Sequence, residues 1–253
     1  YSYFKLKEYS TAAILFEKFI NTNNEDMKMN DDATIRMGDS FFATKEYIKS
    51  INAYKKVVDQ FGASADYAQY QMAMSYGFLK NNDYKISQLE NLLTNFELSN
   101  FRDDALFQLG NSYSAQKENK NAHRVYKTLF KNFPRSSYIS RALLRDGLLF
   151  YNDDENQKAL KNYKEIVTKY PNSAEAKEAV TNAKNVYIDL GTVDEYAIWA
   201  KGISFINITD AEIDNTTYEA AENKFLANDI LKAMEGFKKY IKAFPKGLHA
   251  LQA

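Results

Sequence analysis

The stretch DDALFQLGNSYSAQKENKNAHRVYKTLFKNFP, residues 103–134, decides the fold that we expect for the whole chain. Its apolar residues recur every three to four positions, the period of an amphipathic helix rather than the alternation of a strand. The first run comprises Ala105, Leu106, Leu109, Gly110 and Tyr113. The second comprises Ala122, Val125, Tyr126, Leu129, Phe130 and Phe133. Polar residues 117–121 separate the runs, and Pro134 blocks further helix. The stretch therefore predicts two helices joined by a tight turn.

The same pattern recurs along the chain. The equivalents of Gly110 are Gly38, Ala73, Gly147, Lys184 and Ala221, and successive members lie 35 or 37 residues apart. All three prolines (Pro134, Pro171 and Pro245) fall at one repeat position. A period of this length is typical of stacked repeats, each of which is too small to bury its own apolar face. We therefore expect an all-α fold of stacked helix-turn-helix repeats.

We expect one array over residues 1–253, as a piece of a longer protein. Its repeats are expected at about 1–30, 31–65, 66–102, 103–139, 140–176, 177–213 and 214–250. The sixth is degenerate, because Lys184 and Tyr196 replace small residues where two helices should touch. Residues 201–217 are rich in β-branched residues, Asn and Asp, so we expect an irregular connection there.

The recurring residues resemble those of the tetratricopeptide repeat family. Gly110 and Tyr113 match its G-x-x-Y motif, Ala122 and Tyr126 match A-x-x-x-F, and Pro134 matches the closing proline. The resemblance implies a right-handed superhelix, an α-solenoid, whose first helices line a concave groove. It also implies that this groove binds protein or peptide segments.

Two junctions between repeats, FPRSSY at 133–138 and YPNSAEA at 170–176, add a second resemblance. Together with the 37-residue period they resemble the tetratricopeptide proteins of the bacterial cell envelope, among them outer-membrane-assembly lipoproteins. This implies a role in envelope assembly and a periplasmic or outer-membrane-associated location. A cytoplasmic location is the alternative.

Composition narrows the classes of partner. Lys and Arg number 33 and so do Asp and Glu, which argues against nucleic acid or an anionic membrane as the main partner. No apolar run approaches the roughly 18 residues that a membrane span needs. There is no cysteine, so neither a disulfide nor a thiolate metal site is expected.

Catalytic motifs are missing from the sequence. There is no phosphate-binding loop, dinucleotide-binding motif or zinc-protease motif. His123 and His249 fall in different repeats, and His123 is expected on the surface. The acidic residues 152–156 lack the ligand spacing of a calcium loop and are expected to form a solvated turn. We expect no enzyme activity, no cofactor and no metal site.

The family resemblance also places a set of residues on the groove. They are Tyr67, Tyr70, Met74, Phe107, Gln108, Asn111, Arg141 and Arg145. Arg141 and Arg145 match two positions of the clamp with which co-chaperone members hold a terminal carboxylate, but Tyr70, Met74 and Gln108 depart from it. The alternative for the arginines is pairing with acidic neighbours such as Asp103 or Asp104.

These observations favour a scaffold that binds protein segments in its groove. The alternative is a structural spacer, or an arm that associates with itself and has no dedicated groove.

Overall fold

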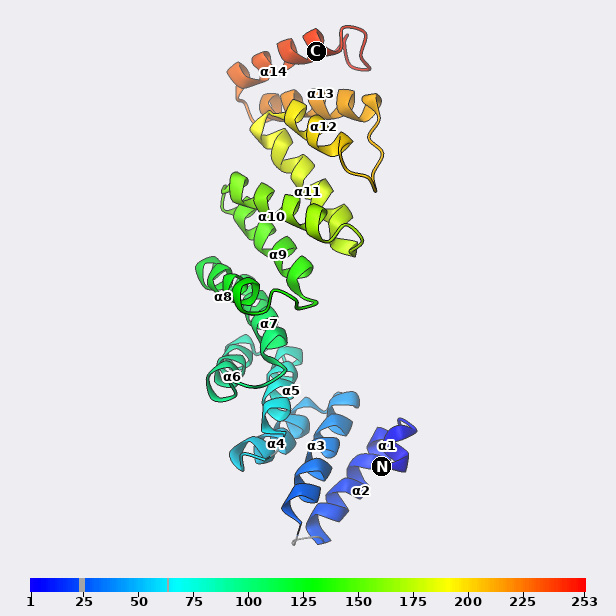
Figure 1. Cartoon of the computed structure of the whole chain (residues 1–253), viewed down its shortest axis with the longest axis vertical. Helices are drawn as coiled ribbons and strands as arrows, with labels where there is room; N and C mark the ends of the chain where they lie inside the picture. The colour runs from blue at the N-terminus through cyan, green and yellow to red at the C-terminus, as the bar shows by residue number, and fades with distance from the viewer. Residues whose placement is uncertain (23–25, 63) are drawn as a thin grey trace. The chain divides into compact units, whose positions relative to one another are not determined.

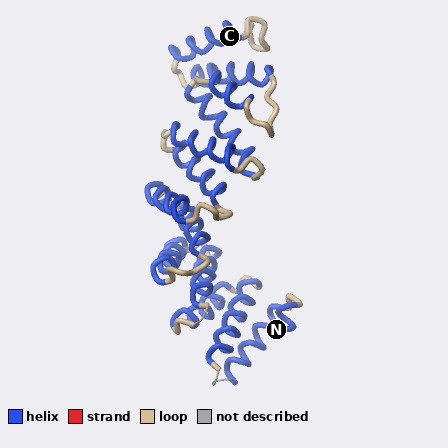
Figure 2. Tube along the Cα trace, in the orientation of Figure 1, coloured by secondary structure: helices blue, strands red, loops and turns tan. Residues whose placement is uncertain are grey.

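The computed structural model describes residues 1–22, 26–62 and 64–253, and 76% of these residues are helical, with no strand among them (Figure 2). The helices are labelled in chain order in Figure 1. This confirms the all-α expectation. The chain divides into two compact units, residues 1–138 and residues 139–253, which we describe separately.

Unit 1 consists of consecutive helices joined by short turns. Its helices are α1 (Ser2–Lys5), α2 (Tyr9–Thr22), α3 (Met27–Ala43), α4 (Tyr47–Asp59), α5 (Ala65–Phe78), α6 (Asn82–Asn95), α7 (Arg102–Ala115) and α8 (Asn119–Asn132). From α2 onward each helix packs on the next one in sequence. Within each pair α3–α4, α5–α6 and α7–α8, only three residues separate the helices, as the template stretch predicts.

Unit 2 repeats this arrangement with one irregular pair. Its helices are α9 (Ile139–Asn152), α10 (Asn156–Lys169), α11 (Ala174–Leu190), α12 (Val193–Lys201), α13 (Asp210–Leu226) and α14 (Ile230–Ala243). The second helix of the sixth repeat, α12, has 9 residues, whereas α10 and α14 have 14.

A glycine in the first helix and a tyrosine in the second set the close contact within a pair. In unit 1 a Cβ at Gly38 would lie 2.7 Å from the ring of Tyr54. In unit 2 a Cβ at Gly147 would lie 2.6 Å from the ring of Tyr163. This confirms that these in-helix glycines serve helix packing, because any side chain there would overlap the ring.

The expected irregular connection after α12 is shorter than predicted. Residues 202–209 are irregular, but residues 210–217 already belong to α13, so that half of the expectation is wrong. The reason is a capping box: Glu212 N donates to Thr209 Oγ1 at 3.2 Å, and Thr209 N donates to Glu212 Oε2 at 2.8 Å. This reciprocal pair satisfies free backbone donors and starts the helix despite its β-branched residues.

The expectation for His123 is also wrong. Its side chain is partly buried rather than on the open surface. The equivalent position in the preceding repeat is Ile86, which is buried, so this position faces the apolar side of the second helix. His249 lies in unit 2, stacked on Tyr218 with ring centroids 4.3 Å apart.

Candidate functional site

The expected groove residues fall on three first helices. Tyr67, Tyr70 and Met74 lie on α5, and Phe107, Gln108 and Asn111 lie on α7, all in unit 1. Arg141 and Arg145 lie on α9 in unit 2. The predicted set is therefore divided between the units: six residues lie in unit 1, and the two arginines lie in unit 2.

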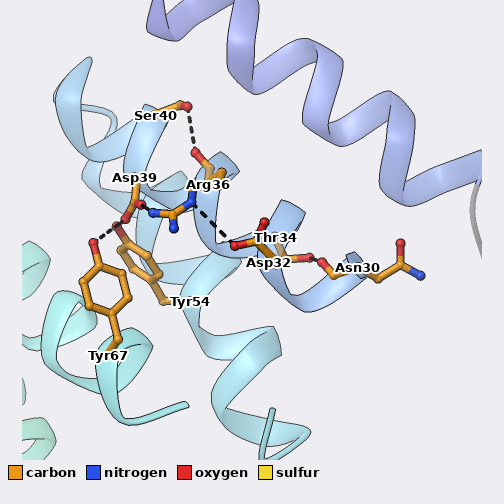
Figure 3. Close-up of polar contacts among 8 residues, drawn as sticks. All are labelled: Asn30, Asp32, Thr34, Arg36, Asp39, Ser40, Tyr54 and Tyr67. Carbon is orange, nitrogen blue, oxygen red and sulfur yellow. Dashed lines mark hydrogen bonds and ion pairs between the residues drawn. The ribbon is translucent and has the colours of Figure 1, made fainter. Parts of the chain in front are cut away.

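Asp39 of α3 anchors one end of the unit 1 part (Figure 3). Its Oδ1 accepts hydrogen bonds from the Tyr54 hydroxyl at 2.7 Å and the Tyr67 hydroxyl at 2.8 Å. Its Oδ2 pairs with Arg36 Nη1 at 3.0 Å, and the Asp39 side chain is 11% exposed. The carboxylate is thus nearly buried, with its charge balanced by Arg36 and its two tyrosine donors fixed in place.

The electrostatics of this cluster keep both tyrosines protonated. Burial, followed by the nearby charge of Asp39, raises the pKa of Tyr54 and the pKa of Tyr67 well above the ordinary value. Arg36 also approaches Asp32, with Nε to Oδ1 at 3.6 Å, so the guanidinium is shared between two carboxylates. In Figure 3 these groups point toward one another from three helices, and the cluster orients the Tyr67 ring.

The sequence reasoning missed Asp39, although a signal for it exists. Asp39 follows Gly38 directly, as Asn111 follows Gly110. Asn111 Oδ1 likewise accepts a hydrogen bond from the Tyr126 hydroxyl, at 2.8 Å. In both repeats the acceptor precedes the tyrosine by 15 residues. The repeat alignment could therefore have identified this hydrogen bond.

Tyr70 is oriented by a ring and by a second carboxylate. Its ring stacks on Phe101 with centroids 5.6 Å apart and planes 19° apart. Its hydroxyl donates to Asp104 Oδ1 at 3.4 Å, and the Tyr138 hydroxyl donates to the same oxygen. Burial, followed by the charge of Asp104, raises the pKa of Tyr70. Asp104 therefore acts as an acceptor for tyrosines.

Phe107 and Gln108 are less available than the sequence suggested. Phe107 is 8% exposed and stacks on Tyr138 with centroids 4.8 Å apart, so it supports the surface from below. Gln108 Oε1 accepts a hydrogen bond from Lys85 Nζ at 3.1 Å. Burial lowers the pKa of Lys85. Of the six predicted residues on these two helices, five remain partly exposed: Tyr67, Tyr70, Met74, Gln108 and Asn111.

The arginines of α9 differ from each other. Arg141 Nε lies 3.8 Å from Glu175 Oε1, and Glu175 also accepts a hydrogen bond from the Ser140 hydroxyl at 3.0 Å. Arg141 thus pairs with an acid of α11. Arg145 is exposed and forms no ion pair within the described part of the chain.

The described residues form neither a metal-binding cluster nor a membrane-spanning helix. Outside residues 23–25 and 63, no three His, Asp or Glu side chains are grouped so that they could hold a metal ion. Over the same residues, no helix has the length and apolar character needed to cross a membrane.

Antiparallel helix pairs stacked in chain order define the class of helical repeat proteins to which both units belong. The sequence model of the tetratricopeptide repeat family matches residues 104–136 and 141–173. The matched helix pairs, α7–α8 and α9–α10, are therefore tetratricopeptide repeats, and they support this family for the chain.

Solved structures with the same fold agree with this assignment. A tetratricopeptide repeat protein from Parabacteroides merdae has a TM-score of 0.60 and 12% identity, over 96% of this chain and 89% of its own. MamA has a TM-score of 0.56 and 18% identity, over 66% and 92%. PilF of Pseudomonas aeruginosa has a TM-score of 0.52 and 12% identity, over 88% and 95%. At these identities the likeness concerns the fold alone. No curated protein sequence matches the chain.

Proposed function

We propose that this chain is a protein-interaction scaffold whose unit 1 binds a segment of a partner protein along α5 and α7. The tetratricopeptide fold supports the general role, because stacked repeats create extended binding surfaces. The contacts that we assign to the segment are Tyr67, Tyr70 and Met74, at positions i, i+3 and i+7 of α5, with Gln108 and Asn111 of α7.

The observation that carries this proposal is the immobilisation of two partly exposed tyrosines. Asp39 holds the Tyr67 hydroxyl at 2.8 Å, and Phe101 packs against both rings with centroids 5.6 Å away. A free side chain loses about 0.5–1.5 kcal/mol of entropy when a ligand immobilises it. Rings that are already fixed avoid most of that cost, and tyrosine is enriched among the residues that dominate binding energy.

The chemistry of the unit 1 surface points to an apolar segment. Tyr67, Tyr70 and Met74 present ring and thioether surface, while Asp39 and Asp104 are already occupied by tyrosine hydroxyls. A separate contact in unit 2 is Arg145, whose exposed guanidinium suits a carboxylate.

The test starts with the full-length protein from its native host, which retains partners for identification by mass spectrometry. The partner is then titrated against Tyr70→Ala combined with Met74→Ala, for which we expect at least a tenfold loss of affinity, about 1.4 kcal/mol. Tyr84→Ala is the control, because Tyr84 is an exposed tyrosine on α6, outside this surface. Equal binding by both variants, or association only of the chain with itself, would contradict the proposal.

A place in bacterial cell-envelope assembly is the finer part of this proposal. It is supported by the junction residues 133–138 and 170–176, which resemble those of envelope tetratricopeptide proteins. Fractionation of the full-length protein tests it, and recovery of the protein in the cytosolic fraction would contradict it.

A further inference from the structure

A cavity of about 620 Å³ lies in unit 2 beside the short helix α12. Its floor is a single stripe of α13, formed by Asp210, Ile213, Thr217, Ala221 and Lys224. These residues follow one another at intervals of three or four and so share one face of the helix; Ile213 and Ala221 are buried, whereas Asp210, Thr217 and Lys224 are at least partly exposed. From residue 210 to residue 224 the stripe extends for about 21 Å at 1.5 Å per residue.

Stripes of the two neighbouring helices form the walls. Ala197 and Lys201 line the cavity from α12, and Gly236 and Lys239 line it from α14. Gly236 packs on the buried Ala221, because a Cβ at 236 would lie 2.8 Å from the Ala221 Cβ, whereas the small side chain of Ala197 is partly exposed and leaves room at the α12 wall. Ile198 of α12 also lines the groove and is 78% exposed. The dimensions and the lining suit one α-helix.

Charges differ between the two walls of this α12–α14 groove. The α14 wall carries Lys232 and Lys239, seven residues apart on one face, against Glu235. The adjoining exposed positions Lys238 and Lys242 add to the positive charge of α14. The α12 wall carries Asp194, followed by the exposed Glu195.

Part of this charge is already compensated within the unit. Lys201 pairs with Asp210 at 3.2 Å, and Lys232 pairs with Asp229 at 2.9 Å. Lys239 is exposed and forms no ion pair within the described residues. On the exposed side of α14 this leaves Lys238, Lys239 and Lys242 against Glu235, so this side of the groove keeps a positive excess.

We propose that the α12–α14 groove binds one amphipathic helix of a partner protein, about four turns long, with acidic residues along the edge that faces α14. Apolar and small side chains of that helix pack on Thr217 of α13 and on Ala197 and Ile198 of α12. The groove belongs to unit 2 and involves none of the unit 1 residues assigned above, so it does not depend on the proposed function.

The test is a displayed library of helical peptides of about 14 residues, the length that fills the stripe. In these peptides, the positions that face the groove vary among Ala, Val, Leu and Ile, and the positions on either side of that face vary between Glu and Lys. Binders are selected on the whole 253-residue chain and counter-selected on Ala197→Trp, in which a large ring fills the groove. Ala211→Trp is the matched control, because Ala211 is exposed on α13 and does not line the groove.

We expect binders that retain their affinity for Ala211→Trp and lose at least tenfold for Ala197→Trp, with Glu enriched on one flank. Lys239→Glu should weaken the same binders at least tenfold. The proposal is overturned if no peptide distinguishes the two tryptophan variants, or if the peptides that do so prefer Lys on both flanks. Ile198→Glu, at an exposed position, replaces Ala197→Trp if that variant does not fold.

Light scattering distinguishes a groove that binds a partner helix from a groove that is filled by a second copy of the chain. We expect a mass that does not differ between the wild type and Ala197→Trp. A dimer that Ala197→Trp abolishes and Ala211→Trp preserves would show that a second copy fills the groove, and would overturn the proposal of a separate partner.

Discussion

The ring of Tyr126 closes over Gly110, so that a Cβ at position 110 would lie 2.4 Å from Cε1 of the ring. Tyr126 is fully buried, and its hydroxyl donates to Asn111 on the helix that carries the glycine. The ring is therefore held at both its edge and its tip. This contact joins α7 to α8 and depends on the absence of a side chain at residue 110.

Gly110→Ala should destabilise the chain. Alanine improves helix propensity by about 1 kcal/mol, but overpacking a filled contact typically costs about 1–3 kcal/mol. The overpacking term wins because the ring of Tyr126 has no room to move. Gly110→Leu should cost more than Gly110→Ala. Urea unfolding of both variants measures the effect, and an unchanged midpoint would contradict the contact.

The matched control is Gly77→Ala on α5. A Cβ there would meet only the side chain of Lys85, at 3.1 Å from its Cδ, and that flexible chain can shift. Gly77→Ala should therefore be neutral or stabilise the chain by up to about 1 kcal/mol. Equal losses at the two glycines would show that ring overlap is not the cause.

Removal of the buried tyrosine hydroxyl should lower stability in the α7–α8 pair but not in the α9–α10 pair. The Tyr126 hydroxyl donates to Asn111 at 2.8 Å, whereas Leu148 occupies the equivalent position before Tyr163. The buried Tyr163 hydroxyl has no hydrogen-bond partner among the described residues. Tyr126→Phe should cost about 0.5–1.5 kcal/mol, and Tyr163→Phe should be neutral or stabilising. Thermal unfolding of both variants measures the difference, and equal losses would contradict this assignment.

Lys117→Gly should stabilise the chain. Lys117 occupies the turn between α7 and α8 with φ of 62°, a left-handed conformation that costs a residue with a Cβ about 1–2 kcal/mol. Glycine avoids that cost but loses more backbone entropy on folding, so we expect a net gain of about 1 kcal/mol or less. Lys127→Gly, at an exposed position inside α8, should instead cost about 1 kcal/mol. Denaturant unfolding of the two variants should give shifts of opposite sign.

Stability should fall at alkaline pH, in part through Tyr113. Burial and then its hydrogen bond to Glu90, at 2.5 Å, raise the pKa of Tyr113 from 10.0 to about 12. Above pH 10 the unfolded chain loses this proton before the folded chain does, so the stabilisation is complete below pH 10 and decreases toward pH 12. Tyr113→Phe should flatten the pH dependence within this window, as measured by unfolding at a series of pH values. An identical slope would contradict the prediction.

Arg141→Ala combined with Arg145→Ala should weaken the binding of an acidic partner at least tenfold and leave thermal stability nearly unchanged. The pair between Arg141 and Glu175 is 3.8 Å long, and the arginine side chain is 53% exposed, so it contributes about 0–1 kcal/mol. Glu175→Gln is the control, because it removes the ion pair with Arg141 but keeps both arginines, and it should not weaken binding. A double variant that binds normally, or that loses several degrees of melting temperature, would show that the arginines are structural.

The helical class and the pairing of helices could be predicted from the sequence because both arise from local chemistry. The apolar period, the in-register prolines and Gly110 each act within one repeat; the apolar period recurs along the chain, and several repeats share the proline or the glycine. A helix pair also forms in the sixth repeat, although Tyr196 stands where a small residue is usual. The ring of Tyr196 packs beside those of Tyr187 and Trp199, with centroids 6.0 and 6.3 Å away. Residues 210–217 were misread because a capping box outweighs the low helix propensity of β-branched residues.

What each exposed polar side chain does was decided only by the tertiary structure. The family resemblance predicted that Tyr67 lines the groove, but it could not show that the hydroxyl acceptor of Tyr67 is Asp39, which is 28 residues away in the chain and on another helix. The same holds for Arg141, whose partner Glu175 lies on a different helix from the neighbours that the sequence suggested. Helix periodicity specifies which face a side chain occupies, whereas its partner depends on the packing of helices that are distant in sequence.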